Sequence, residues 1–141
     1  MIRPAVASDA QALSELLTQL GYPSSVSEVT GRLDALAAFP RAVAFVAING
    51  YGEVVGLVTG QLFPSIHDNQ PVAWLTTLVV LEDARGAGIG SSLVKHIEEW
   101  ATQNGARRLA VTSATHREAA HVFYEKRDYE RTGVRFGKRL T

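Results

Sequence analysis

The chain has 141 residues, of which 46% are hydrophobic and 20% are charged, and its 14 acidic side chains balance its 14 basic ones. This length and composition predict a single domain, residues 1–141, with one core. The balanced charge gives no electrostatic reason to expect nucleic acid or an anionic membrane as the main partner, and the absence of cysteine excludes disulfides, thiolate metal sites and a cysteine nucleophile.

The N-terminal residues 1–5 lack the apolar core of a signal peptide. The longest apolar run, residues 42–48, is far too short to cross a bilayer. Together with the absence of cysteine, these features lead us to expect a cytoplasmic protein.

Two amphipathic helices are predicted first along the chain. Ser8 or Asp9 can cap the first helix, and Gly21 ends it. Ser25 or Ser27 opens the second helix, whose apolar side chains recur at three- and four-residue steps.

Strands are predicted next. Residues 42–48 are rich in β-forming side chains, and Asn49-Gly50 is a hairpin signal that leads into a returning strand over 53–62. A loop with two prolines follows at 63–71, and residues 74–81 form another β-prone run.

The last third alternates between helix and strand. An amphipathic helix over 89–102 precedes a short strand at 109–112, and a second helix over 118–126 precedes strand-like segments at 129–140. The order of elements predicts a mixed α/β fold in one domain.

Residues 85–90, Arg-Gly-Ala-Gly-Ile-Gly, form a glycine-rich turn between the strand at 74–81 and the helix at 89–102. Such a turn leaves backbone N–H groups bare at the positive end of the helix, where phosphate anions bind. The turn therefore predicts a phosphorylated ligand.

Two common phosphate-binding loops fit this turn poorly. A nucleotide-triphosphate loop needs a lysine after the last glycine, but Ser91-Ser92 follows Gly90. A dinucleotide fingerprint needs a third glycine where Ser91 stands, and an acid at the end of the next strand, which 109–112 lacks. A dinucleotide-binding protein is the weaker alternative.

A third pattern fits better. Leu78-Val79-Val80 before the glycine turn, and Tyr124 to Tyr129 with Ala120 four residues before the tyrosine, resemble motifs of the GNAT superfamily of acetyl-CoA-dependent N-acetyltransferases. The resemblance covers nearly the whole chain. It implies a central, mostly antiparallel, twisted sheet flanked by helices, with splayed central strands. It also implies acetyl-CoA as co-substrate, no metal, and a possible homodimer.

The resemblance further implies how the cofactor is held. Backbone N–H groups of residues 85–91 would bind the pyrophosphate, and the pantetheine arm would pair with the strand backbone at Leu78 and Val80. The N–H of Val80 would then stabilise the oxyanion. The residues expected to contact the cofactor are Leu78, Val79, Val80, Arg85, Gly86, Ala87, Gly88, Ile89, Gly90, Ser91 and Arg117.

Tyr124 is the catalytic candidate, because the resemblance implies that this phenol protonates the leaving thiolate. Without the resemblance it would be interpreted as a half-buried helix tyrosine beside Phe123. Arg117 stands where the family often has asparagine, so it either meets a cofactor phosphate or is a solvated residue at a helix start. Asp128 replaces a usual glycine and is expected in the left-handed conformation.

No general base is evident. Thr76 and Thr77 stand where many members of the family carry an acid. His67 and Asp68, in the loop before the strand, are candidates for binding the acceptor, although a surface histidine is the alternative. None of the four histidines is paired at the spacing of a zinc motif.

These features lead us to expect an enzyme that moves acetyl from acetyl-CoA to a primary amine, most simply that of a small molecule. One alternative is acetylation of a protein N-terminus or lysine. Another is a non-catalytic acyl-CoA-binding sensor, which the missing strand acid favours and Tyr124 opposes.

Overall fold

The computed structural model describes residues 1–113 and 115–141. Its internal contacts divide the chain into two compact units, Met1–Ala110 and Val111–Thr141. The first unit holds nearly all of the sheet and three α-helices, and the second holds one α-helix and the C-terminal segment. In the part of the chain that is described, no helix combines the length and apolarity needed to cross a membrane.

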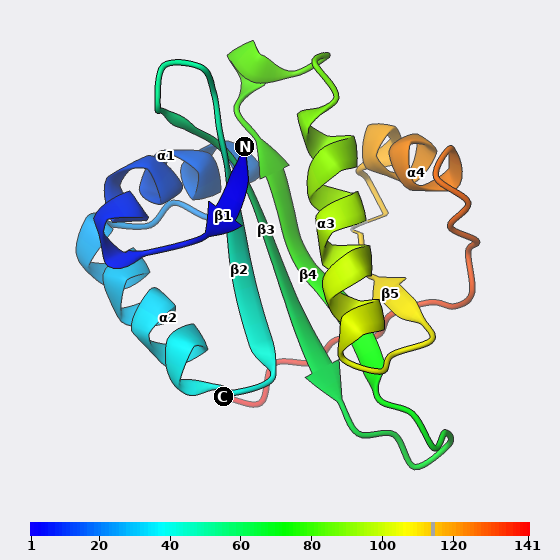
Figure 1. Cartoon of the computed structure of the whole chain (residues 1–141). Helices are drawn as coiled ribbons and strands as arrows, with labels where there is room; N and C mark the ends of the chain where they lie inside the picture. The colour runs from blue at the N-terminus through cyan, green and yellow to red at the C-terminus, as the bar shows by residue number, and fades with distance from the viewer. Residues whose placement is uncertain (114) are drawn as a thin grey trace. The chain divides into compact units, whose positions relative to one another are not determined.

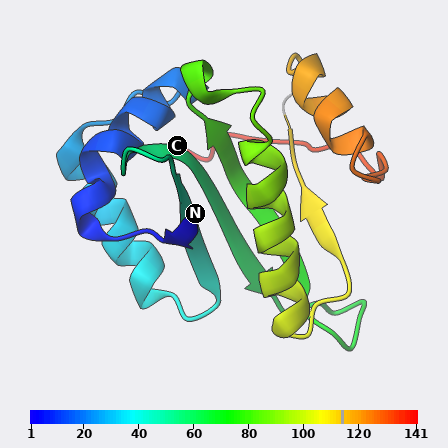
Figure 2. The ribbon, with the colours of Figure 1, turned by 45° about the horizontal axis from the view of Figure 1, so that its top comes forward.

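The sheet has five strands in the order β1-β2-β3-β4-β5. Strands β1 to β4 pair antiparallel, and β5 runs in the direction of β4, so the sheet is mixed (Figures 1 and 2). The strands are β1 Ile2–Pro4, β2 Ala42–Ile48, β3 Val54–Phe63, β4 Val72–Val80 and β5 Leu109–Val111. The sequence did not predict β1, because three residues are too few to show a periodicity.

Helices cover both faces of this sheet. Leu57 of β3 packs in one cluster with Leu13 of α1 (Ala10–Leu20) and Val29 of α2 (Val26–Ala38). Its neighbour Gly56 instead faces α3 (Ile89–Gln103). Because successive strand residues point to opposite faces, α1 and α2 lie on one face and α3 on the other.

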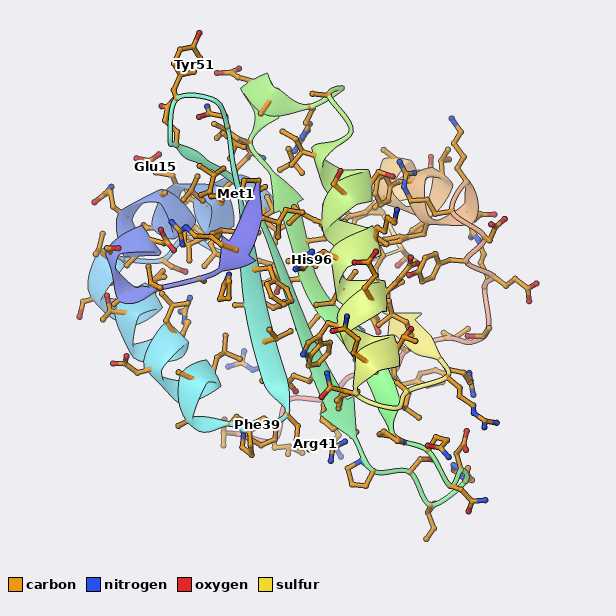
Figure 3. All side chains as sticks on the ribbon, viewed as in Figure 1. Met1, Glu15, Phe39, Arg41, Tyr51 and His96 are labelled. Carbon is orange, nitrogen blue, oxygen red and sulfur yellow. The ribbon has the colours of Figure 1, made fainter. Side chains whose placement is uncertain are left out.

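The β2–β3 hairpin confirms the signal at Asn49. The side-chain oxygen of Asn49 accepts hydrogen bonds of 2.9 Å from the backbone N–H groups of both Tyr51 and Glu53. The positive φ of this turn, +79°, falls on Gly52 rather than on Gly50. Tyr51 stands at the tip and points into solvent, with 90% of its surface exposed (Figure 3).

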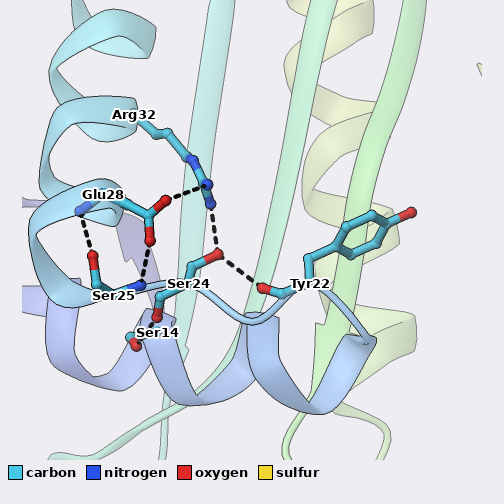
Figure 4. Close-up of polar contacts among 6 residues, drawn as sticks. All are labelled: Ser14, Tyr22, Ser24, Ser25, Glu28 and Arg32. Carbon is cyan, nitrogen blue, oxygen red and sulfur yellow. Dashed lines mark hydrogen bonds and ion pairs between the residues drawn. The ribbon is translucent and has the colours of Figure 1, made fainter. Parts of the chain in front are cut away.

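Both predicted helix signals at the α1–α2 junction are confirmed. Gly21 ends α1 with φ +107°. Ser25 caps α2 by accepting from the N–H of Glu28, whose carboxylate accepts from the N–H of Ser25 in return (Figure 4). Arg32 donates to the hydroxyl of Ser24 at 2.7 Å, so the loop between the helices is tied to α2.

Asp9 does not cap α1 in the manner predicted. It occupies the N-cap position, but its carboxylate makes no cap hydrogen bond to that helix. Instead it accepts two hydrogen bonds from Arg3, at 2.8 and 2.9 Å, and one from the N–H of Val6. A paired guanidinium competes successfully for the carboxylate because charge-assisted, bidentate bonds are the stronger ones.

Close packing of α3 on β3 depends on two glycines. A methyl group at Gly60 would lie 2.9 and 3.0 Å from two carbons of Ile97 and 3.3 Å from Trp100, and one at Gly56 would lie 2.9 Å from Leu93. Leu93 and Ile97 are fully buried, so they have little room to move. Farther along the same face, His96 meets the ring of Phe45 edge-on, with centroids 4.5 Å apart.

The second unit corrects one prediction. It holds α4 (Glu118–Glu125), but residues 129–140 form no strand, although strand-like segments were expected there. Val134, Phe136 and Leu140 are 81%, 91% and 90% exposed. Apolar alternation makes a strand only where a neighbouring edge supplies backbone partners, and two glycines further weaken the segment.

Replacing Gly60 by alanine is expected to destabilise the protein by about 1–3 kcal/mol, because the added methyl overpacks the α3 interface. Gly31→Ala is the matched control: Gly31 is an exposed α2 position with no atom within 4 Å of the new methyl, and alanine there should stabilise by up to about 1 kcal/mol. Denaturant unfolding of both variants measures whether the free energy of unfolding falls in Gly60→Ala and rises in Gly31→Ala. Equal effects would contradict this account of the packing.

A second prediction concerns pH. The hydrogen bonds from Arg3 lower the pKa of Asp9, assisted by the N–H of Val6 and opposed by burial. A lowered folded-state pKa gives stability that is present above the unfolded carboxyl pKa of about 4 and is lost as pH falls through the folded value. Urea unfolding between pH 6 and pH 3 should therefore show wild type more stable than Asp9→Asn at pH 6, with the gap closing at low pH.

Candidate active site

The glycine turn connects β4 to α3, as the sequence predicted. A short 3-10 turn, η2 (Glu82–Ala84), follows β4, and the chain then reaches α3 through Gly86 at φ +89° and Gly88 at φ +77°. A methyl at either glycine would meet nothing within 4 Å. Glycine is therefore needed at both positions for the left-handed backbone conformation, and not because a side chain would clash.

The start of α3 presents bare amides. Gly88 is the N-cap residue, and it has no side chain with which to cap the helix. The N–H of Ser92 is the first to reach back to the Gly88 carbonyl, at 3.0 Å. The N–H groups of Ile89 and Gly90 therefore stand outside the helical ladder at its positive end, which suits an anion.

The register between β3 and β4 orients the backbone before this turn. The N–H of Leu81 donates to the carbonyl of Val55 at 2.8 Å, and Gly56 stands opposite Val80. In an antiparallel pair, hydrogen-bonded and non-bonded residue pairs alternate. The backbone groups of Val79 therefore bond toward β3, whereas those of Leu78 and Val80 turn away from it.

A β-bulge interrupts β4 just before these residues. Thr59 stands opposite Thr77 and Gly60 opposite Leu75, so Thr76 is the extra residue. The N–H of Ala73, near the start of β4, donates to the carbonyl of Arg108 just before β5. Since β5 ends at Val111, three residues later, this strand stops near the bulge and does not run alongside Val80.

A side chain from α1 holds the end of β4. The amide of Gln19 donates to the carbonyl of Val80 and accepts from the N–H of Glu82, both at 2.9 Å. The Nε of Arg85 also donates to the Val80 carbonyl, at 3.3 Å. The sequence did not indicate this role of Gln19, because no local pattern links residues more than 60 positions apart.

Tyr124 lies among aromatic rings within the second unit. Its ring meets Phe123 edge-on at 5.3 Å and Tyr129 at 5.7 Å between centroids. Burial raises the pKa of Tyr124 to about 12, although the charge of Arg117 acts in the opposite direction. The phenol therefore keeps its proton throughout the physiological range.

The structure places both residues that depart from the family pattern, Arg117 and Asp128. Arg117 is the N-cap residue of α4, and its charge influences Tyr124. Asp128 adopts φ +67°, the left-handed conformation that was predicted, and the N–H of Tyr129 then donates to the carbonyl of Tyr124.

His67 and Asp68 are exposed in the loop between β3 and β4. The N–H of His67 donates to the hydroxyl of Ser65, and the carboxylate of Asp68 accepts from the N–H of Gln70. This loop enters the start of β4, whereas the glycine turn follows its end, about 26 Å of strand away. The structure does not bring these two side chains to the glycine turn, and their role in binding an acceptor stays a prediction.

Residues 11–129 match the sequence profile of the Acetyltransferase (GNAT) family. The chain belongs to this family. It is therefore an acyltransferase by descent, and its mixed sheet with helices on both faces is the GNAT fold.

Relatives with named activities support the assignment to the GNAT family. The chain is 36% identical to the aminoalkylphosphonate N-acetyltransferase of Salmonella typhimurium over 63% of its own length and 58% of that protein, so the match spans little more than half of this relative. It is 27% identical to an aminoglycoside N(6')-acetyltransferase of Stenotrophomonas maltophilia, over 93% of this chain and 86% of that one.

A solved N-acetyltransferase structure has the same fold. The glucosamine-6-phosphate N-acetyltransferase from Arabidopsis thaliana superposes with a TM-score of 0.87 at 20% identity, covering 100% of this chain and 98% of that one.

Gln19→Leu is expected to loosen the end of β4. It removes two hydrogen bonds, which together stabilise the fold by about 1–3 kcal/mol. Hydrogen exchange of the Glu82 amide should accelerate in this variant. Gln19→Glu is the matched control, because a carboxylate still accepts from Glu82 but cannot donate to Val80. An unchanged rate of hydrogen exchange at the Glu82 amide in Gln19→Leu would contradict this role of Gln19.

Proposed function

We propose that this GNAT protein transfers the acetyl group of acetyl-CoA to the primary amine of a small molecule. The observation that carries the proposal is the orientation of one stretch of backbone. Leu78 and Val80 turn their N–H groups away from β3, immediately before a turn with left-handed glycines at Gly86 and Gly88.

The position of this backbone indicates where acetyl-CoA, the acetyl donor, would bind. The amides of the glycine turn and of the first turn of α3 suit the pyrophosphate of CoA, since both present N–H groups at a positive helix end. The pantetheine arm can add to the edge of β4 as an extra strand would. The Val80 N–H then faces the thioester carbonyl as the oxyanion donor.

The reaction needs one bond made and one broken. The lone pair of the neutral amine attacks the thioester carbon and forms the C–N bond, while the carbonyl oxygen gains negative charge. Collapse of this intermediate breaks the C–S bond. Tyr124 donates its phenolic proton to the departing thiolate and regains one from water, and the amine nitrogen releases a proton to solvent.

Tyr124 carries a proton at physiological pH, and its raised pKa makes it a weaker acid than a free phenol. A phenol with a pKa of about 12 carries its proton at physiological pH, so it is ready to donate. Arg117 at the start of the same helix makes the developing phenolate less costly.

The choice of a small amine rests on two relatives. One is named for an aminoalkylphosphonate and the other for an aminoglycoside, and both names describe small molecules with amino groups.

The test is acetyl-CoA-dependent thiol release with a panel of aminoalkylphosphonates, aminoglycosides, polyamines, amino acids and short peptides. The chain has no cysteine, so a thiol reagent reports only the CoA released. Tyr124→Phe is expected to lower kcat by at least about tenfold with one class of amine, because the acid that protonates the thiolate is lost.

Tyr51→Phe is the matched control, since Tyr51 is exposed at the hairpin tip, and its turnover should equal that of wild type. CoA should raise the melting temperature of all three proteins, and NAD should not. Equal turnover of Tyr124→Phe and wild type would contradict the catalytic role. CoA binding without release from any amine would favour a sensor, and release only with peptides would favour a protein acetyltransferase.

A further inference from the structure

Two asparagines of this chain are followed by glycine, Asn49 in the β2–β3 hairpin and Asn104 at the end of α3. An asparagine side chain loses its amide nitrogen when the next backbone nitrogen attacks the side-chain carbonyl carbon. Glycine obstructs this attack least, because it has no side chain and its backbone has the widest conformational freedom. The surroundings of the two carboxamides differ, and they decide which one reacts.

The carbonyl oxygen of the Asn49 side chain is held by two backbone donors. It accepts hydrogen bonds of 2.9 Å from the N–H groups of Tyr51 and Glu53. The bond from Tyr51, two residues ahead, folds the carboxamide back over the intervening Gly50 amide. Attack on the carbonyl carbon moves negative charge onto this oxygen, and two N–H groups that already point at it stabilise that charge.

The amide nitrogen of Asn49 has a negatively charged partner. Its Nδ2 donates to the carboxylate of Glu53 at 3.1 Å. A backbone N–H only donates and a carboxylate only accepts, so the three bonds together fix which end of the carboxamide is nitrogen. Nδ2 must gain a proton to leave as ammonia, and the charge of Glu53 favours the protonated form.

The attacking nitrogen is that of Gly50. Gly50 is exposed, and its N–H has no hydrogen-bond partner among the described residues. Solvent can therefore take the proton of this N–H without any bond within the protein being broken. The hairpin leaves the nucleophile free while it holds the carboxamide beside it.

Asn104 lacks each of these features. Its Nδ2 donates to the carbonyl of Trp100 at 2.8 Å, which turns the carboxamide back along α3. In the described part of the chain, no N–H donates to its side-chain oxygen. The N–H of Gly105 donates to the carbonyl of Thr102 at 3.1 Å, so an attack by this nitrogen first requires that bond to break. The same dipeptide therefore has a bound nucleophile at the end of α3 and a free one in the hairpin.

We propose that Asn49 is a site of spontaneous deamidation, in which the N–H groups of Tyr51 and Glu53 stabilise the oxyanion and the Glu53 carboxylate favours departure of the nitrogen. The Gly50 nitrogen loses its proton to hydroxide and forms a bond to Cγ of Asn49. The bond from Cγ to Nδ2 then breaks, and the nitrogen leaves as ammonia with a proton from water, which regenerates the hydroxide. Water opens the five-membered imide at either carbonyl and yields aspartate or isoaspartate. The inference does not depend on the proposed acetyl transfer.

The experiment follows both asparagines in the wild-type protein during incubation in mildly alkaline buffer. Each conversion exchanges NH for O and adds a negative charge, so ion-exchange chromatography separates the product and fragment mass spectrometry locates it. We expect Asn49 to convert at least about tenfold faster than Asn104, because only Asn104 has a nucleophile that must first lose a hydrogen bond. Asn49 should also convert at least as fast as it does in an unfolded peptide of residues 43–56, which lacks the oriented N–H donors.

Two variants separate the roles of the nucleophile and the carboxylate. A methyl group at Gly50 would meet nothing within 4 Å, so Gly50→Ala keeps the fold. It restricts the backbone at the attacking nitrogen, and we expect it to slow conversion of Asn49 by at least about tenfold. Glu53→Gln should slow conversion by about three- to tenfold, because a neutral partner favours the protonated nitrogen less. Neither variant should change the rate at Asn104, which is the matched control within each chain.

Similar rates at Asn49 and Asn104 would overturn this inference. So would slower conversion of Asn49 in the folded chain than in the peptide, because the hairpin would then protect the carboxamide. Equal rates in Gly50→Ala and wild type would contradict attack by the Gly50 nitrogen, and equal rates in Glu53→Gln and wild type would contradict the role of the carboxylate.

Discussion

The alternation of hydrogen bonds between β3 and β4 is the constraint on which the candidate site depends. Because Leu81 and Val79 bond toward β3, the intervening backbone of Val80 must face the other way. The short β5 stops near the bulge, so it does not run alongside that backbone. A strand edge whose N–H groups are already oriented is a surface to which an extended ligand can add without any change in the fold.

Two packing features hold the glycine turn next to that edge. Gly56 and Gly60 let α3 approach β3 closely, which fixes the start of the helix relative to the sheet. Gln19 and Arg85 both bond the carbonyl of Val80, and Gln19 also bonds the N–H of Glu82. The start of the helix is therefore fixed by contacts outside the turn, and the end of the strand by Gln19 together with Arg85 of the turn itself. The left-handed glycines need only connect them.

The acid and the acceptor side of the chemistry differ in character. Within our proposal, Tyr124 is the proton donor for the thiolate, and burial raises its pKa to about 12, so the phenol is protonated at physiological pH. The strand position where related enzymes often carry an acid has threonines, and a hydroxyl is too weak a base to take a proton from an ammonium group. Within our proposal, the amine attacks in its neutral form and releases its proton to solvent.

The sequence alone determined those features that depend on local chemistry or on a family motif. The helix signals at Gly21 and Ser25, the hairpin at Asn49, the glycine turn, the left-handed Asp128 and membership of the GNAT family were all predicted, because each is carried by a few adjacent residues. The tertiary structure decided the features that depend on distant partners. Asp9 pairs with Arg3, residues 129–140 form no strand, and Gln19 bonds the carbonyl of Val80. The hydrogen bond between the side chains of Thr59 and Thr76 likewise required a bulge whose register no single strand encodes. Hydrogen bonds between segments are chosen by three-dimensional proximity, and periodicity along the chain carries no information about that choice.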